Sequence, residues 1–180
     1  DSASIDSESL ILEVGPGNGA ITKLLVEKDV PVIAFEIDTR LKSELDKIKS
    51  DNLKVIYGDF LNVNLDDVLK NYKYSNIHLI ANLPYYITTP IIMGLFEKHI
   101  PATSITVMVQ KEVAQRICAC AGSSDYSAFS IYIAYYAQAE ILFDVPRDCF
   151  VPQPKVDSAV VRLIPRSEPP VQVSNEKLLF

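Results

Sequence analysis

The stretch Leu10–Gly19 reads LILEVGPGNG and joins an apolar run to a glycine-rich turn. The run Leu10–Val14 has the length and composition of a buried strand. Three glycines follow at alternate positions, and a segment with helical spacing of its apolar residues begins at Ala20. Glycines in such a turn allow a tight bend and let a ligand approach the backbone closely. The stretch therefore predicts a strand, a turn and a helix that together border a ligand site.

Outward from this stretch, short apolar runs alternate with amphipathic segments. We expect strands at 10–14, 32–35, 53–57, 77–81 and 105–109, and helices at 20–28, 41–49, 90–97 and 111–119. The first helix is expected to carry Ile21, Leu24 and Leu25 on one face. This alternation predicts an α/β fold with a mostly parallel, doubly wound sheet and helices on both faces.

The pattern changes after residue 125. A tyrosine-rich apolar segment at 128–137 predicts a helix, and two strands are expected at 140–145 and 158–164. Three prolines between these strands exclude a full helix there. We therefore expect an antiparallel strand near the C-terminus.

Composition and charge limit the class of protein. The chain has 180 residues, of which 48% are hydrophobic and 22% charged, as in a globular domain of ordinary size. No signal peptide or membrane-length apolar run is visible, so we expect a cytoplasmic protein. The net charge of -6 argues against nucleic-acid binding unless a local basic face exists. His78 and His99 are isolated and the cysteines have no zinc spacing, so no metal site is expected.

Acidic residues follow the second and third predicted strands. Glu36 lies about 20 residues past the glycines, where a carboxylate can accept hydrogen bonds from ribose hydroxyls. Asp38 has the alternative role of capping the next helix. Asp59 can accept from an adenine amino group, with Phe60 against the ring, or it can belong to an ordinary turn. The spacing of Gly15-x-Gly17-x-x-Ala20 also fits a looser dinucleotide fingerprint.

The motif Asn82-Leu83-Pro84-Tyr85 follows the fourth predicted strand and is the most specific signal in the chain. The lone pair of an adenine N6 amine is delocalised into the ring, so the amine must be positioned to react. The Asn82 side-chain oxygen and the Leu83 carbonyl can accept its two N–H bonds. Pro84 stiffens the loop, and Tyr85 offers a stacking face to a flipped base. The motif predicts catalysis by positioning and electrostatics.

With these motifs the chain resembles the ribosomal RNA adenine N6-dimethyltransferases from about Leu10 to Arg166. The similar blocks are residues 13–17, 82–85, 87–90, 109–116 and 150–161. The last block is closer to the small-subunit enzymes than to the resistance enzymes that act on large-subunit RNA. The resemblance implies a Rossmann-like S-adenosylmethionine-dependent methyltransferase fold.

The resemblance also assigns roles to residues. It implies that S-adenosylmethionine is bound by residues of the two loops and the acidic strand ends, namely Glu13, Gly15, Gly17, Glu36, Ile37, Asp59, Phe60 and Asn82. Asn82, Leu83, Pro84 and Tyr85 are expected to hold the target amine. Phe150 is expected to form the other wall of the base pocket, unless it is a core residue. Lys111 and Arg116 are expected to meet RNA phosphate, unless they belong to a solvated helix face.

The implied activity is N6,N6-dimethylation of adenosines in small-subunit ribosomal RNA, by a monomer acting on a ribosomal precursor. Residues 1–165 are expected to form the methyltransferase domain, without an N-terminal segment that the family has. Residues 166–180 are expected to be a linker to an absent helical RNA-binding domain. The alternatives are a large-subunit resistance methyltransferase, a non-catalytic assembly or transcription factor, and a nicotinamide dehydrogenase. The dehydrogenase leaves the Asn-Leu-Pro-Tyr motif unexplained.

Overall fold

The computed structural model describes residues 5–173 of the chain. These residues form two compact units that divide between Thr106 and Val107, within strand β5 (Ser104–Gln110). Residues 174–180 of the expected linker lie outside the described residues. The domain boundary expected at residue 165 stays a prediction.

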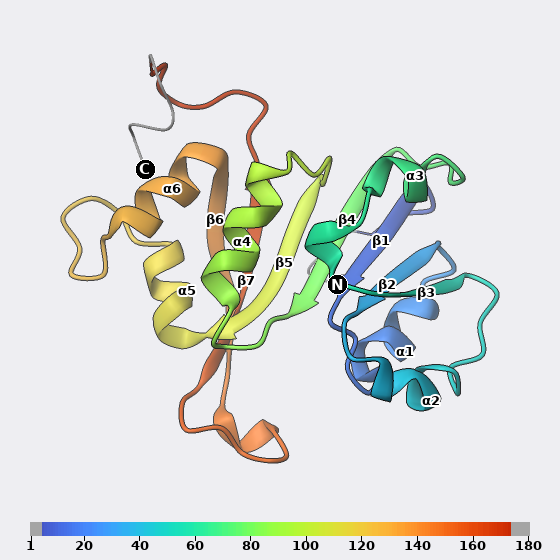
Figure 1. The fold of residues 1–180 in the computed structure, drawn as a ribbon. Coiled ribbons are helices and arrows are strands. Elements are labelled where there is room, and N and C mark those ends of the chain that lie inside the picture. Colours follow the sequence, from blue (N-terminus) through green and yellow to red (C-terminus); the bar gives the residue numbers. More distant parts are fainter. Residues whose placement is uncertain (1–4, 174–180) are drawn as a thin grey trace. The chain divides into compact units, whose positions relative to one another are not determined.

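The first unit contains four neighbouring parallel strands in the order β3-β2-β1-β4 (Figure 1). Their bounds are β1 (Ser9–Val14), β2 (Val32–Glu36), β3 (Leu53–Tyr57) and β4 (Asn76–Asn82). Val14 pairs with Phe35 on one side and with Ala81 on the other. The carboxyl ends of these strands therefore meet at one edge, where open α/β sheets bind their ligands.

The helices of the first unit divide between the two faces of this sheet. They are α1 (Ala20–Val26), α2 (Lys42–Leu45), α3 (Leu65–Leu69) and α4 (Thr88–Glu97), with short 3-10 turns η1 (Thr39–Leu41) and η2 (Phe60–Asn62). The chain moves outward from β1 to β3 and then returns to the other side of β1 as β4. Right-handed crossovers then place α1 and α2 on one face and α3 and α4 on the other. The predicted doubly wound fold is confirmed.

The strand predictions were accurate because the central strands are buried on both faces. Leu10, Ile11 and Leu12 are fully buried, so β1 appears in the sequence as a continuous apolar run. All five strands predicted up to residue 109 begin and end within one residue of the observed ones.

The helix predictions were less accurate. Leu24 is 62% exposed, and Thr22 occupies the buried face of α1 beside Leu25 instead. The helix predicted at 41–49 is shorter: a 3-10 turn precedes α2, which ends at Leu45. The backbone N–H of Ile48 then donates to the Leu45 carbonyl (3.0 Å), a tighter turn than an α-helix makes. The five-residue helix α3 was not predicted.

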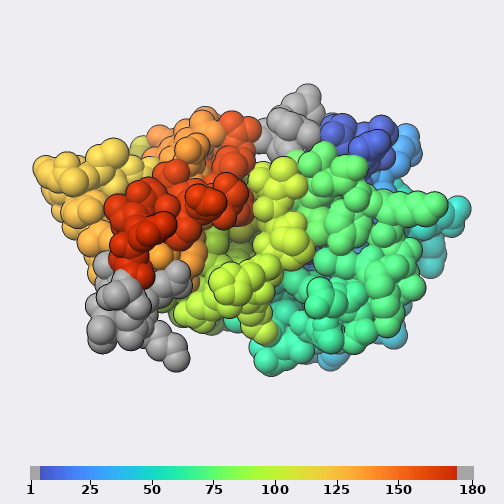
Figure 2. Space-filling model, turned by 90° about the horizontal axis from the view of Figure 1, so that it is seen from above, coloured from blue at the N-terminus to red at the C-terminus, as the bar shows by residue number. Residues whose placement is uncertain are grey.

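The second unit contains α5 (Lys111–Ile117), α6 (Ala128–Tyr136), the turn η3 (Arg147–Cys149) and the strands β6 (Ala137–Val145) and β7 (Ser158–Pro165). β6 and β7 are antiparallel, with a register shift between Ile141 and Phe143. The predicted antiparallel strand near the C-terminus is confirmed. The chain beyond β7 lies against the end of α6, where the Arg166 N–H donates to the Tyr136 carbonyl at 2.8 Å (Figure 2).

The cysteines are free thiols in unequal surroundings. Cys118 is half-buried, and burial raises its pKa to about 11. Cys120 and Cys149 are exposed, and Cys149 ends the turn η3. Separately, none of the helices between residues 5 and 173 has the length and apolar character needed to cross a membrane.

Candidate functional site

The glycine turn after β1 has the conformation that its sequence predicts. Gly15 and Gly17 have φ angles of 74° and 59°, in the left-handed region where a side chain is strained. The Gly15 N–H donates to the Phe35 carbonyl at 3.0 Å, which fixes the turn against β2. A Cβ atom added at Gly17 would meet no other atom within 4 Å. The turn therefore offers an open stretch of backbone to a ligand.

Glu36 connects the glycine turn to the end of β2. Its side chain is 4% exposed, and its two carboxylate oxygens accept from different backbone groups. Oε2 accepts from the Gly17 N–H at 3.0 Å, and Oε1 accepts from the Asp38 N–H at 2.8 Å. An ionised carboxylate has about four acceptor positions, so each oxygen can accept one further hydrogen bond. This arrangement fits the predicted ribose contact, which stays a prediction.

Glu13 is a second buried carboxyl group beside the turn. It is 2% exposed, and burial raises its pKa to about 7, with the charge of Glu36 adding to the rise and Thr22 opposing it. Its Oε2 atom has no hydrogen-bond partner among the described residues. A buried polar atom without a partner is costly, and a donor on a bound ligand can satisfy it.

The other acidic side chains of this edge act mainly as caps. Asp38 accepts from the Arg40 N–H at 3.0 Å, and hydrogen bonds from Arg40 lower its pKa to about 2. The predicted capping role of Asp38 is confirmed. Asp59 is exposed and accepts from the Leu61 N–H at 3.0 Å, as in an ordinary turn. Its predicted contact with an adenine amine stays a prediction.

Two apolar residues of the predicted cofactor site differ in exposure. Phe60 is buried and packs edge-on against Phe35, with ring centroids 4.9 Å apart. Ile37 is 71% exposed directly after Glu36. A hydrophobic side chain with this exposure offers a free apolar surface at the edge where ligands bind.

The Asn82–Tyr85 motif adjoins the glycine turn. A Cβ atom added at Gly15 would lie 3.9 Å from the Asn82 carbonyl oxygen, so the two loops lie next to each other where β1 and β4 end. Asn82 ends β4, and its exposed side chain hydrogen-bonds to no other residue in the part of the chain described. Its amide is therefore available to a ligand at the point where strand order reverses between β1 and β4.

The loop that carries the Asn82 amide is anchored by a buried side chain and by hydrogen bonds. The Leu83 side chain is buried. The Pro84 carbonyl accepts from the Ile87 N–H and from the Thr88 hydroxyl, both at 3.1 Å. Tyr85 is half-buried and follows directly. The buried Leu83 side chain and the two hydrogen bonds to the Pro84 carbonyl hold the loop in place. Asn82 therefore has little freedom to move, as catalysis by positioning requires.

The remaining predicted site residues belong to the second unit. Phe150 is half-buried and follows the turn η3. Lys111 pairs with Asp144 at 2.6 Å, which raises the pKa of the lysine, and Arg116 pairs with Glu112 at 3.3 Å. Both predicted RNA contacts are thus already matched with carboxylates. Their roles, like that of Phe150, stay predictions.

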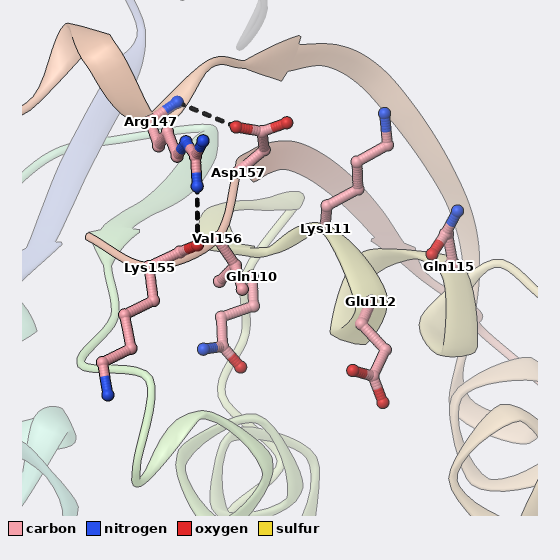
Figure 3. Close-up of a pocket in the computed structure, with 8 residues that line it drawn as sticks. All are labelled: Gln110, Lys111, Glu112, Gln115, Arg147, Lys155, Val156 and Asp157. Carbon is pink, nitrogen blue, oxygen red and sulfur yellow. Dashed lines mark hydrogen bonds between the residues drawn. The ribbon is translucent and has the colours of Figure 1, made fainter. Parts of the chain in front are cut away.

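The second unit contains a pocket of about 470 Å³ that was not predicted from the sequence (Figure 3). It is lined by the start of α5 and the β6–β7 loop, namely Gln110, Lys111, Glu112, Gln115, Arg147, Lys155, Val156 and Asp157. Lys155 lies inside the block 150–161 on which the family resemblance rests. That position was the available signal, but the pairing of Lys111 with Asp144 was not visible in the sequence.

The surroundings of His78 disfavour a charged imidazole ring. His78 is buried, and its Nδ1 lies 2.8 Å from the Ser104 hydroxyl. Burial lowers the pKa of His78, which favours a neutral ring. Across residues 5–173, no three His, Cys, Asp or Glu side chains are grouped so that they can hold a metal ion.

The chain is similar to proteins of one family, by a family model and by individual relatives. The family model described as ribosomal RNA adenine dimethylase matches residues 1–180. Ribosomal RNA small subunit methyltransferase A of Lachnoclostridium phytofermentans is 49% identical over 99% of the chain, and that of Geobacillus thermodenitrificans is 45% identical over all of it. The chain spans 63% of the length of each of these relatives.

Two solved structures are similar to the chain in both fold and sequence. A dimethyladenosine transferase from Plasmodium falciparum has a TM-score of 0.77 and 33% identity, covering 91% of this chain and 58% of that one. The 23S rRNA methyltransferase ErmE has a TM-score of 0.79 and 29% identity, covering 96% of this chain and 68% of that one. These likenesses bear out the predicted Rossmann-like methyltransferase fold.

Proposed function

The chain belongs to the ribosomal RNA adenine dimethylase family, and on this premise we propose that it methylates N6 of adenosines in small-subunit ribosomal RNA. The methyl donor is S-adenosylmethionine and the final product is N6,N6-dimethyladenosine. The observation that carries the proposal is the free amide of Asn82, held on an anchored loop that lies next to the glycine turn. The names of the relatives at 45–49% identity support the small subunit as the source of substrate.

The residues around the glycine turn fit S-adenosylmethionine. The open backbone at Gly17 accommodates the close approach of a ligand, and Glu36 keeps acceptor capacity for ribose hydroxyls. The partnerless Oε2 of Glu13 can accept from a donor of the methionine part. Ile37 and Phe60 supply apolar surface, and Asp59 supplies an acceptor, for the adenine part. When bound, this cofactor supplies an electrophilic methyl group on a positively charged sulfur.

The Asn82–Tyr85 loop prepares the target amine for reaction. The Asn82 amide oxygen and the Leu83 carbonyl accept the two N–H bonds of N6, which turns the nitrogen lone pair away from the loop. These acceptors also stabilise the positive charge that develops on N6 as it gains a methyl group. Pro84 keeps the loop stiff, and its carbonyl is held by Thr88. No general base is needed for methyl transfer itself; after each transfer the cationic N6 would lose one proton to water, and S-adenosylhomocysteine would be released.

Aromatic side chains hold the adenine ring itself. A base must leave its stack before its N6 can reach the loop, and an aromatic surface recovers part of the lost stacking energy. Tyr85 supplies one face for the flipped base. The role expected of Phe150, which lies in the second unit, stays a prediction.

The test is methyl transfer from labelled S-adenosylmethionine by the intact natural protein. Under-methylated small subunits and large-subunit RNA are offered separately, and the RNA is digested for nucleoside analysis. We expect dimethyladenosine from the small-subunit RNA alone. Product from large-subunit RNA would instead support a resistance methyltransferase, the alternative favoured by the likeness to ErmE. Cofactor binding without any product would support a non-catalytic assembly factor.

The setting of the reaction is part of the same proposal. The protein acts as a monomer in the cytoplasm on a precursor of the small ribosomal subunit. Sedimentation of the protein with and without these precursor particles tests this: we expect a monomer alone and co-sedimentation in the mixture. A stable dimer in the absence of particles would contradict the proposed monomer.

A further inference from the structure

We propose that the pocket between the start of α5 and the β6–β7 loop binds a phosphate group of the RNA backbone next to the target adenosine. The inference rests on the proposed function and adds to it a binding site with Arg147 and Lys155 as its cationic residues. It differs from the sequence-based expectation, which assigned phosphate binding to Lys111 and Arg116.

Part of the charge that lines the pocket is already neutralised by ion pairs. Two of the charged residues of the pocket pair with partners outside it: Lys111 with Asp144 at 2.6 Å, and Glu112 with Arg116 at 3.3 Å. Three charged residues remain in the pocket, namely Arg147, Lys155 and Asp157. Two cations and one carboxylate leave a net charge of +1, which suits a single phosphodiester.

The Asp157 carboxylate already accepts a hydrogen bond from within the protein. Asp157 Oδ1 accepts from the backbone N–H of Arg147 at 3.0 Å, and its charge also helps to raise the pKa of Lys111. The carbonyl of Asp157 accepts from the Lys111 N–H at 3.0 Å. Asp157 thereby ties both ends of the loop and the start of α5 together, so its role is structural and its charge is partly balanced.

The two cations remain available to a ligand. The Arg147 guanidinium donates to the Lys155 carbonyl at 3.2 Å, a neutral partner that leaves the rest of its donors free. The Lys155 side chain is exposed and has no hydrogen bond or ion pair with the part of the chain described. Figure 3 shows both residues on the same loop, with the Gln110 side chain beside Lys155.

Phosphate is the ligand chemistry that this set fits. A guanidinium offers a planar pair of donors that matches two phosphate oxygens, and an ammonium adds a point charge. The amide groups of Gln110 and Gln115 are further donors of a kind that contacts nucleic-acid backbones. A volume of about 470 Å³ lies within the range of pockets that enclose a group of nucleotide size.

The position of the loop specifies which phosphate is bound. Phe150 and Lys155 lie on the same β6–β7 loop, five residues apart. A chain segment of this length spans at most about 17 Å. If Phe150 is a wall of the base pocket, the phosphates next to the flipped adenosine are within reach of Lys155.

The test is the salt dependence of RNA binding by Lys155→Gln, a variant that removes the charge and disturbs no described contact. Affinity for a small-subunit RNA fragment is measured by fluorescence anisotropy at several salt concentrations. The loss of one phosphate contact lowers the slope of log affinity against log salt by about 0.7–0.9, which is roughly a five- to eightfold weaker affinity at 0.1 M salt. Lys155→Arg should bind as the natural protein does.

The control is Lys54→Gln, which removes one exposed lysine from β3 in the first unit. Equal slopes for Lys155→Gln and Lys54→Gln would overturn the inference. Cofactor affinity is measured in parallel and should be unchanged in both variants. The two proposals fail separately: absence of methylated product from the natural protein refutes the proposed function, whereas normal product with an unchanged slope in Lys155→Gln refutes only this pocket.

Discussion

The two units of the chain place their charges differently. Residues 1–106 carry ten of the 17 Lys and Arg and 15 of the 23 Asp and Glu, so they account for -5 of the net charge of -6. The carboxylates proposed for the cofactor site, Glu13 and Glu36, are buried beside the glycine turn. Residues 107–180 are almost neutral, at -1. Three exposed ion pairs lie within their described part, namely Lys111–Asp144, Arg116–Glu112 and Arg162–Glu140.

This difference separates two ways of building a binding site. The proposed cofactor site depends on backbone geometry and buried groups, so changes there should have large effects on stability or affinity. The proposed RNA surface depends on exposed charges, each of which contributes little to stability. The overall acidity is therefore compatible with RNA binding, because most of it lies in the first unit.

The largest effect is expected from Asn82→Ala. Removing the amide takes away an acceptor that acts on the reacting nitrogen, so methyl transfer should fall by about 10²–10³-fold, or roughly 3–4 kcal/mol. Because Asn82 is exposed and bonds to no described residue, the melting temperature should stay close to the natural value. Gln138→Ala, which removes an exposed amide from β6, is the control. Substantial transfer by Asn82→Ala would disprove its role.

The next largest effect is expected from Glu13→Gln, on the pH dependence of the free energy of unfolding. The folded pKa of Glu13, about 7, lies above the ordinary value of 4.5, so the folded state binds more protons between these values. Stability therefore falls as pH rises from 4.5 to 7, and Glu13→Gln removes this penalty. We expect the variant to gain up to roughly 3 kcal/mol over the natural protein at pH 8, and almost nothing at pH 4.5.

Urea denaturation of the cofactor-free protein at the two pH values measures this effect. Glu44→Gln is the control, because that carboxylate is exposed and pairs only with Lys47. An offset between Glu13→Gln and the natural protein that is the same at pH 4.5 and pH 8 would show that proton binding at Glu13 is not its cause.

A smaller effect is expected from Glu36→Ala. The substitution removes the proposed ribose contact and releases the Gly17 and Asp38 N–H groups. Cofactor affinity should fall by roughly 1–3 kcal/mol, the range for hydrogen bonds to a charged group. Calorimetric titration with S-adenosylhomocysteine gives the dissociation constant. An unchanged constant would exclude the ribose contact.

The smallest effect is expected from Arg116→Gln. Its pairing with Glu112 across one helical turn is exposed, so stability should change by only about 0.3–0.5 kcal/mol. Because the charge is already matched, RNA affinity should fall by no more than about twofold, less than in Lys155→Gln. The anisotropy assay used for Lys155 measures both variants. A larger loss in Arg116→Gln would reverse the assignment of the phosphate contact.

The sequence was a good guide where burial is complete. The strands β1, β2 and β5 could be predicted because they are mostly apolar runs buried along most of their length, and the turn after β1 because its positive φ angles favour glycine. The Asn82–Tyr85 motif was found for a similar reason. Its residue types have a specific chemical use at a strand end.

The sequence-based predictions failed where contacts between residues distant in the sequence determine a helix end or an ion pair. Ile48 continues the helical spacing of Leu41 and Leu45, yet α2 ends before it, and a Cβ atom on Gly19 would clash with the Ile48 side chain. Lys111 pairs with Asp144, 33 residues away, which no local pattern reveals. Such pairings determine which cations remain available, so the phosphate pocket was visible only in the structure.

The exposed Cys149 gives the β6–β7 loop a chemical reporter. It directly precedes Phe150, whereas the pKa of about 11 keeps the Cys118 thiol protonated and unreactive near neutral pH. An alkylating reagent will therefore modify Cys149 and Cys120 well before Cys118. A ligand that covers the loop will slow alkylation at Cys149 while leaving Cys120 as an internal reference. The natural sequence thus carries its own footprinting probe, and occupancy of the loop can be followed by mass spectrometry without an introduced label.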